Sequence, residues 1–364
     1  MVMIGIDPHK RNHTAVAVNR CEDVLSKRLV HAGSAQIAEL IGWADGLDDK
    51  QRTWAIESAG GLGYLLAQQL LAAGERVVDI PAVLSARVRV LSSGTSNKND
   101  PNDAFSVAVA ALHAKQLIEV RVEDHATILR LLTRRHTQLA QAHNKAACRL
   151  HALMCDLIPG GIRKEIVARQ AAQLLDSITP STRVAAQRLL LARDLLADVE
   201  LLVEQRRESK RRITAAVAAS GTTLTEIFGV GVVVAGTLIG HAGDPNRFTT
   251  ADRFAAYNGT APVERSSGDP NSKIWRLSRR GNRTMNHAIH MAAVTQIRHR
   301  HSIGRAFYDR KLAEGKSPKK ALRALKRRIS DTVLPTPHSR RRPRRSTLKR
   351  GPGRATRKRL HKPA

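Results

Sequence analysis

Four acidic residues in the first third of the chain are of the right type to hold metal ions together. Asp7 ends one short apolar run, and Glu57 ends a second. Asp100 and Asp103 are three residues apart at the start of a predicted helix, so their carboxylates face the same way. Carboxylates placed together repel one another unless a cation neutralises them, and their oxygens suit Mg²⁺ or Mn²⁺. Two such ions would support phosphoryl transfer, because they activate the attacking oxygen and stabilise the leaving one.

Each of these acids also has a simpler interpretation when it is taken alone. Asp100 could cap its helix, with Pro101 at the first helical position, and Asp103 could be a solvated acid of the first turn. Glu57 could end a strand at the protein surface. The combination of all four in one strand-rich region is more specific than any member of it.

The charge of the chain favours a polyanionic partner. Lysine and arginine number 61 against 31 acidic residues, which gives a net charge of +30. Aromatic residues make up only 3 %, which argues against binding of single strands by rows of stacked aromatic rings. The balance predicts nucleic-acid binding. By itself it is equally compatible with a non-enzymatic basic protein that packages or chaperones nucleic acid.

The spacing of apolar residues predicts four regions. Residues 1–120 begin with three predicted strands and continue with alternating helices and strands, which is typical of a mixed α/β sheet. Residues 121–215 show helical periodicity and predict long helices, as an antiparallel pair or coiled coil that links or oligomerises the chain. Residues 216–334 predict a mainly helical domain around a loop rich in Gly, Ser and Arg. Residues 335–364 carry about a dozen basic residues and no acid, and we expect a disordered tail.

Membrane insertion and disulfide bonding are not indicated by the sequence. The longest apolar run is shorter than the roughly 18 residues that a membrane span needs. Three cysteines provide no disulfide framework. We therefore expect a cytoplasmic protein of bacterial type, associated with the nucleoid and without a membrane partner.

An ordered series of short motifs carries a family resemblance. In the first region the motifs read GIDPHK at 5–10, AIE at 55–57 and NKNDPNDA at 97–104, and in the third region they read YNGTAP at 257–262, SSG at 266–268 and LSRRGNR at 277–283. This series resembles the DEDD-type insertion-sequence transposases, a family that includes Piv-like DNA invertases and recombinases guided by a bridge RNA. The resemblance extends from residue 3 to about residue 331.

The resemblance implies a fold and a set of catalytic acids for the first region. The fold is RNase H-like, similar to the RuvC Holliday-junction resolvase. The four acids of the family fall on Asp7, Glu57, Asp100 and Asp103, as catalytic residues and ligands of Mg²⁺ or Mn²⁺. Lys10 matches a lysine that the family often has after the first acid, and we assign it to phosphate contact.

For the third region the resemblance implies a serine nucleophile that forms a covalent protein–DNA phosphoester. We choose Ser267, with Ser266 as the alternative. The basic loop beside it is expected to contact the DNA backbone, and comprises Arg276, Arg279, Arg280 and Arg283. The Asp269–Asn271 segment and the basic tail depart from the family pattern.

The resemblance also implies partners: DNA of the element ends and target, a structured non-coding RNA that chooses the DNA sites, and a homodimer or homotetramer. Two other functions remain open on the residues alone. One is a RuvC-like, metal-dependent junction nuclease that forms no covalent intermediate. The other is the non-enzymatic basic protein described above.

Overall fold

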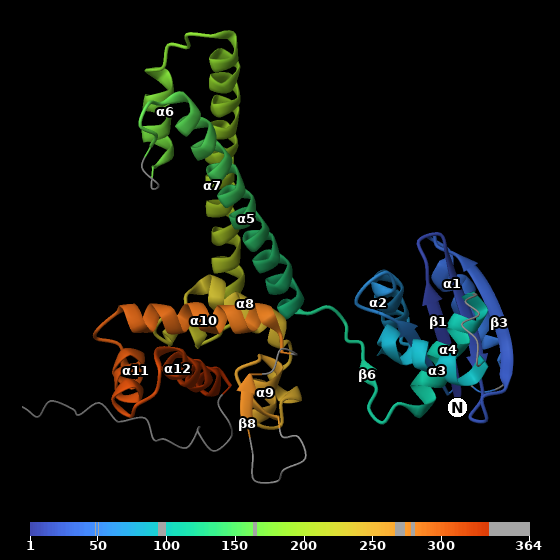
Figure 1. The fold of residues 1–364 in the computed structure, drawn as a ribbon. Coiled ribbons are helices and arrows are strands. Elements are labelled where there is room, and N and C mark those ends of the chain that lie inside the picture. The colour runs from blue at the N-terminus through green and yellow to red at the C-terminus, as the bar shows by residue number, and fades with distance from the viewer. Residues whose placement is uncertain are drawn as a thin grey trace, which may run out of the picture. The chain divides into compact units, whose positions relative to one another are not determined.

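The computed structural model of the protein describes residues 1–47, 49, 51–93, 100–162, 166–265, 274–277 and 281–334. The chain divides into two compact units, which meet in the sequence between Asp124 and His125 (Figure 1). Each unit is described below by itself.

A six-stranded sheet forms the centre of the first unit. Its strands are β1 (Val2–Pro8), β2 (Asn12–Val18), β3 (Val24–His31), β4 (Arg52–Glu57), β5 (Val77–Ile80) and β6 (Ile118–Glu119). They lie in the order β3-β2-β1-β4-β5-β6. β2 is antiparallel to β1 and β3, β4 is parallel to β1 and β5, and β6 is antiparallel to β5. This order, with its antiparallel second strand, is that of the RNase H-like fold, so the predicted fold class is confirmed.

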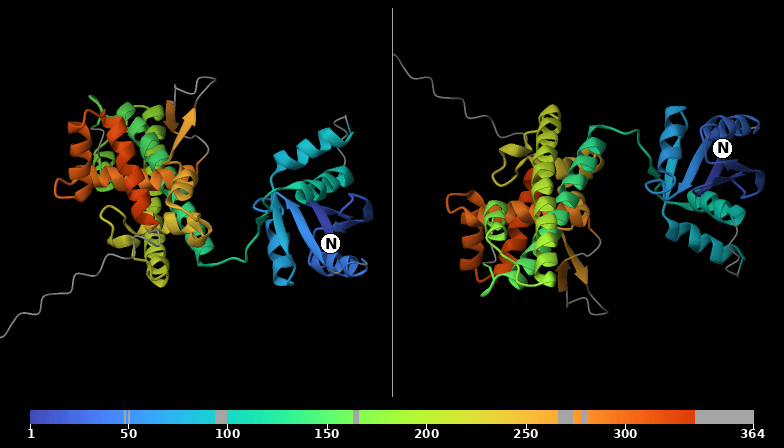
Figure 2. Two further views of the ribbon diagram at one scale, coloured as in Figure 1. Left: turned by 90° about the horizontal axis from the view of Figure 1, so that it is seen from below. Right: turned by 90° about the horizontal axis from the view of Figure 1, so that it is seen from above.

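Helices cover both faces of this sheet. They are α1 (Gln36–Asp45), α2 (Tyr64–Ala72), α3 (Ala82–Ser93) and α4 (Asp100–His113). Successive strand residues point to opposite faces. Ile4 and Ile6 accordingly pack in one core with α1 and α2, whereas Met3 packs in the other core with α4. α3 lies beside α4 (Figure 2).

A glycine allows α4 to cross the sheet at very short range. A Cβ atom at Gly5 would lie 2.1 Å from the carbonyl oxygen of Ala104 and 2.5 Å from the backbone nitrogen of Ala108. No side chain can fit there. The part of α4 that directly follows its first turn is therefore held over β1, two residues before Asp7.

Two long antiparallel helices dominate the second unit (Figure 1). They are α5 (His125–Leu157) and α7 (Arg183–Ala219), with α6 (Ala168–Asp176) packed against α7. The start of α5 meets the end of α7, because the ring nitrogen Nε2 of His125 lies 2.7 Å from the carbonyl oxygen of Ala216. Their distant ends share an apolar core with α6, in which Met154 of α5 and Leu196 of α7 pack with Leu175 of α6. Helical periodicity in the middle of the sequence thus corresponds to helices.

The remaining elements of the second unit pack around the other end of this pair. They are η1 (Leu224–Glu226), α8 (Val232–Ala242), η2 (Pro245–Arg247), α9 (Ala251–Tyr257), β7 (Pro262–Arg265), β8 (Ile274–Leu277), α10 (Arg283–Arg298), α11 (Ile303–Ala313) and α12 (Pro318–Val333). α8 crosses α5 closely, since a Cβ atom at Gly240 would lie 2.6 Å from the backbone nitrogen of Arg130. Leu129 and Ile213 of the long helices therefore share one core with α8, α10 and α12.

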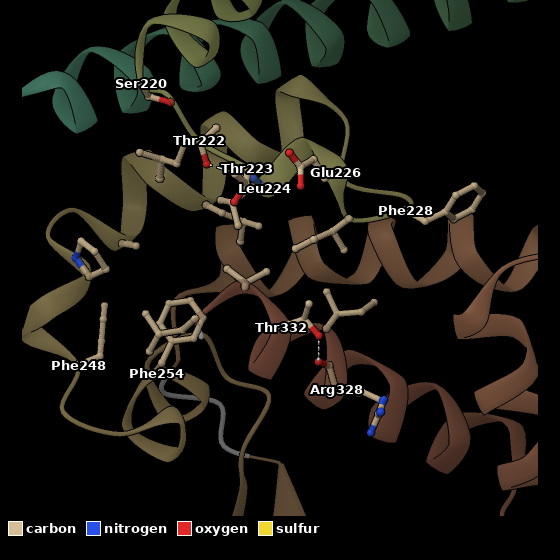
Figure 3. A pocket seen from close by; sticks show the side chains of 18 of the residues that line it. Ser220, Thr222, Thr223, Leu224, Glu226, Phe228, Phe248, Phe254, Arg328 and Thr332 are labelled. Atoms are coloured by element: carbon tan, nitrogen blue, oxygen red, sulfur yellow. Dashed lines mark hydrogen bonds between the residues drawn. The ribbon is translucent and has the colours of Figure 1, made fainter. Parts of the chain in front are cut away.

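A cavity of about 1380 Å³ opens within the core that α8, α10 and α12 share. Its wall is largely apolar, and Phe248 and Phe254 stand together on it (Figure 3). The hydroxyl of Thr332 is turned back onto the carbonyl oxygen of Arg328, at 3.0 Å. Glu226 is the one carboxylate among the lining residues, so the cavity lacks the paired acids that a metal centre needs.

Among the residues described, no helix is long and apolar enough to cross a membrane.

Candidate carboxylate metal site

Two of the predicted acids lie side by side at the ends of neighbouring parallel strands. Ile6 of β1 pairs with Ile56 of β4, so the next residue on each strand is Asp7 and Glu57 respectively. Both acids lie on the face that α4 covers, because they are two residues after Gly5 and Ala55. The Asp7 side chain is only 11 % exposed. Parallel pairing of two strands thus places two carboxylates at one edge of the sheet.

The first turn of α4 brings the other two acids to the same edge. Asp103 is buried, whereas the Asp100 side chain is 59 % exposed at the first residue of the helix. The close packing of α4 on Gly5 sets their height above β1. Residues that are distant in the sequence therefore meet in one small cluster.

The ionisation of the cluster reflects both burial and mutual repulsion. Burial raises the pKa of Asp7; His9 opposes that rise, and the charges of Asp103 and Asp100 add to it. Burial also raises the pKa of Glu57, and the like charges of Asp7 and Asp103 raise it further. The carboxylates are thus close enough to disfavour one another's charged forms, which is the electrostatic condition for holding a cation.

Three polar side chains that the sequence analysis missed contact these acids. Nε2 of His9 lies 3.0 Å from Oδ2 of Asp7. Arg89 forms an ion pair with Asp103. The Ser85 hydroxyl donates a hydrogen bond to Oε1 of Glu57 at 3.2 Å. Arg89 and Ser85 both lie on α3. The sequence feature that could have indicated this helix is the run Ala82–Ser93, which contains neither Gly nor Pro.

The predicted nucleic-acid contacts are only partly within the described residues. Lys10 is exposed in the turn between β1 and β2. Arg283 is exposed at the first residue of α10, where the Asn282 side chain caps the helix by accepting from the backbone N–H of Met285 at 3.0 Å. Arg276 lies in β8, and nothing is described of its side chain. Ser266, Ser267, Arg279 and Arg280 lie outside the described residues.

The two ends of the loop that carries these serines are clamped together. A Cβ atom at Gly281 would lie 2.4 Å from the Cα of Gly259, so only two glycines allow this approach. The Asn286 amide donates to the carbonyl oxygens of Asn258, at 3.0 Å, and Gly259, at 2.9 Å. The Lys326 ammonium donates to Oδ1 of the Asn286 amide at 2.6 Å, and burial lowers the pKa of Lys326. The residues on either side of this loop are therefore held together by close backbone packing and partly buried hydrogen bonds.

The fold and the four acids together define a class of protein. An RNase H-like sheet with carboxylates clustered at its edge is an arrangement that can hold divalent ions for phosphoryl transfer. A family model described as a transposase, of the DEDD type, matches residues 4–159, and one described as the transposase IS116/IS110/IS902 family matches residues 221–309. The chain belongs to this family of DEDD transposases, and it is an enzyme that acts on DNA as a transposase.

Proteins of three insertion elements are similar to the chain over most of their length. The chain is 29 % identical to the uncharacterized 42 kDa protein of insertion element IS900 from Mycobacterium paratuberculosis, with 90 % of the chain and 93 % of that protein covered. It is 26 % identical to the uncharacterized 44.8 kDa protein of IS116 from Streptomyces clavuligerus, with 91 % and 93 % covered. A protein of IS110 from Streptomyces coelicolor is 27 % identical, with 75 % and 78 % covered.

Two solved structures of Thermus thermophilus RuvC are also similar to part of the chain. One is RuvC itself, at 15 % identity and a TM-score of 0.26, covering 33 % of this chain and all of that one. The other is RuvC in complex with a Holliday junction substrate, at 16 % identity and a TM-score of 0.25, covering 33 % of this chain and 99 % of that one.

The raised pKa of Asp7 leads to a prediction about stability. In the metal-free protein at neutral pH, Asp7→Asn is expected to raise the melting temperature. Because the folded-state pKa lies above the unfolded value, the stability that this group contributes is fully present below the unfolded pKa and is lost as pH rises through the folded pKa. The difference in melting temperature between Asp7→Asn and wild type should therefore grow from acidic to neutral pH. It should amount to roughly 4 °C for each kcal/mol by which the variant is more stable, in a unit of this size.

Thermal unfolding followed by circular dichroism in EDTA, at acidic and at neutral pH, measures this difference. Glu39→Gln is the matched control, since Glu39 is exposed on α1, and it should leave the melting temperature unchanged. Excess Mg²⁺ should stabilise the wild-type protein and not Asp7→Asn. A variant that is less stable than wild type at neutral pH without metal would contradict the argument.

Proposed function

We propose that the protein cleaves and rejoins DNA with Mg²⁺ or Mn²⁺ ions held by Asp7, Glu57, Asp100 and Asp103. One observation carries the metal-dependent part of the proposal: carboxylates from β1, β4 and α4 converge, and the pKa values of Asp7 and Glu57 are raised. A partly buried cluster of like charges destabilises the fold unless it binds positive charge.

The residues present fit divalent ions. All four acids offer hard oxygen ligands, which Mg²⁺ and Mn²⁺ accept. Without metal, Arg89 supplies positive charge to Asp103, and the His9 ring lies against Asp7. Bound ions would supply activation of the attacking oxygen and neutralisation of the charge that develops on the scissile phosphate.

The chain's own residues then have separate tasks. Asp7, Glu57 and Asp103, which are wholly or partly buried, hold the centre, and exposed Asp100 closes it from the first turn of α4. Ser85 orients Glu57 through its hydrogen bond. Lys10, exposed beside the strand that carries Asp7, contacts a DNA phosphate.

The strand-joining step is assigned to Ser267, with Ser266 as the alternative. The serine hydroxyl oxygen attacks the scissile phosphorus, one phosphorus–oxygen bond to deoxyribose breaks, and the leaving sugar oxygen takes up a proton. The phosphoester conserves the cleaved bond until a second DNA end displaces the serine. Arg276, Arg279, Arg280 and Arg283 steady the phosphate backbone during this exchange.

The proposed partners follow from the family resemblance and agree with the net charge of +30. A structured non-coding RNA chooses the DNA sites, the protein acts as a homodimer or homotetramer, and it works on the nucleoid in the cytoplasm. The long α5–α7 pair offers a surface on which copies of the chain could associate.

A recombination assay on the element's own DNA ends tests the proposal. Protein purified from cells that carry the element should co-purify with one discrete RNA, identified by sequencing. Strand joining should require that RNA and a divalent metal, and EDTA or ribonuclease should each abolish it. Joining that persists without RNA would remove the guided part of the proposal, and joining that persists in EDTA would remove the metal part.

A further inference from the structure

We propose that His9 is a further metal ligand of the carboxylate centre and gives one metal position a preference for Mn²⁺ over Mg²⁺. The inference rests on the proposed metal-dependent function and deepens it. Nothing in the motif series assigns His9 a role; its position in the structure does.

The His9 ring lies between two of the acids. Its Nε2 atom is 3.0 Å from Oδ2 of Asp7 and 3.6 Å from Oδ1 of Asp100. Among the described residues, these three form the group of potential ligands whose donor atoms all lie within 4.8 Å of one another. One member comes from β1, one from the turn after it and one from α4, so the fold converges them.

These separations suit neighbouring ligands of a single ion. Metal–ligand bonds of about 2.1 Å at right angles place adjacent ligand atoms about 3.0 Å apart. The 3.0 Å and 3.6 Å separations are close to that value, so small side-chain rotations would bring all three atoms onto one ion. The half-exposed ring also leaves space for water on the remaining positions.

The turn that carries His9 is held by backbone hydrogen bonds. The backbone N–H of His9 donates to the carbonyl oxygen of Asn12 at 3.0 Å. The backbone N–H of Ala32 donates to the carbonyl oxygen of Arg11 at 2.7 Å. A ligand on an anchored turn loses little conformational freedom on binding, which favours metal affinity.

A nitrogen donor changes which ion the position prefers. Mg²⁺ favours oxygen ligands, whereas imidazole is an ordinary ligand of transition metals. One ring nitrogen beside two carboxylates should therefore favour Mn²⁺, while an all-oxygen position would discriminate less. Replacing His9 by glutamine, which offers an oxygen, should reduce Mn²⁺ affinity on the order of tenfold and leave Mg²⁺ affinity nearly unchanged.

Pulsed electron paramagnetic resonance on the Mn²⁺-loaded, full-length protein tests this directly, because it detects a nitrogen bound to the ion. Wild type should show imidazole nitrogen coupling, and His9→Gln should lose it. His31→Gln is the matched control, since exposed His31 lies near the same turn and contacts Asn12 at 3.2 Å; it should retain the coupling. Titration calorimetry with Mn²⁺ and Mg²⁺ measures the change in preference.

The outcomes separate this inference from the proposed function. Bound Mn²⁺ without nitrogen coupling in wild type, or coupling that survives in His9→Gln, would overturn the role of His9 and leave the carboxylate centre standing. Failure of wild type to bind Mn²⁺ or Mg²⁺ at all would instead overturn the proposed function. Asp7→Asn should bind neither ion with wild-type affinity, since it removes the carboxylate nearest the His9 ring.

Discussion

Asp7→Asn is expected to reduce DNA cleavage and strand joining by at least about 10³-fold, which corresponds to about 4 kcal/mol of activation free energy. Asp7 is mostly buried and contributes to the raised pKa of Glu57, so it lies at the centre of the carboxylate cluster. An amide of the same shape removes the negative charge that holds the metal, and with it the stabilisation of the transition state. Asp103→Asn should behave alike, because Asp103 acts on the pKa of both Asp7 and Glu57.

Single-turnover cleavage by preformed protein–DNA complexes measures this loss separately from binding. DNA affinity should be unchanged or slightly higher in Asp7→Asn, because the variant removes a negative charge near the DNA. Glu39→Gln, at an exposed acid on α1, should cleave like wild type. If Asp7→Asn and Asp103→Asn retained every activity within a few-fold, the non-enzymatic basic protein would be the better interpretation.

The second large effect is expected at the serine. On a suicide DNA substrate, wild type should leave an adduct that survives denaturation, and Ser267→Ala should abolish it. Removal of the hydroxyl oxygen removes the atom that forms the phosphoester, so no residual covalent product is possible by this route. Strand joining should fall with the adduct, whereas DNA binding should remain.

Ser266→Ala is the matched control in the same loop. An adduct that persists in Ser267→Ala and disappears in Ser266→Ala would move the nucleophile by one residue. If wild type cleaves DNA and no adduct forms, the chain acts as a RuvC-like, metal-dependent nuclease without a covalent intermediate. Mass spectrometry of the digested adduct identifies the attached peptide and decides between the serines.

Local pattern allowed much of the fold to be predicted. The apolar runs that end in Asp7 and Glu57 form β1 and β4, and the helical periodicity after residue 121 corresponds to α5 and α7. These elements depend on the alternation of side chains within a few residues, which the sequence displays directly. α3 was missed, although a run without Gly or Pro follows Pro81. The apolar residues of α3 do not follow a helical period, because Val90 and Leu91 are exposed. α3 is held in place mainly by its packing against α4.

The site was predicted less completely than the fold. Asp7 and Glu57 pointed to metal chemistry because a carboxylate at the end of an apolar strand breaks its local pattern. Asp100 and Asp103 did so because residues three apart on a helix face the same way, and the order of all four acids matched the DEDD resemblance. Ser85 and Arg89 break no pattern, since polar residues are ordinary on a helix. His9 also looked like a turn residue. These contacts span 28, 14 and 91 positions in the sequence, so periodicity has no information about them.

By itself the sequence therefore determined which side chains are of the right type for metal chemistry and which predicted strands carry two of them, and its net charge favoured a polyanionic partner. Only the tertiary structure decided that they meet. The close packing of α4 on Gly5 brings Asp103 to Asp7, and parallel pairing of β1 with β4 aligns Glu57 beside them. The physical reason is that burial and repulsion depend on distance in space: the four acids become a cation site only when packing brings their charges together, and the burial of Asp7 and Asp103 limits the water that would otherwise screen them.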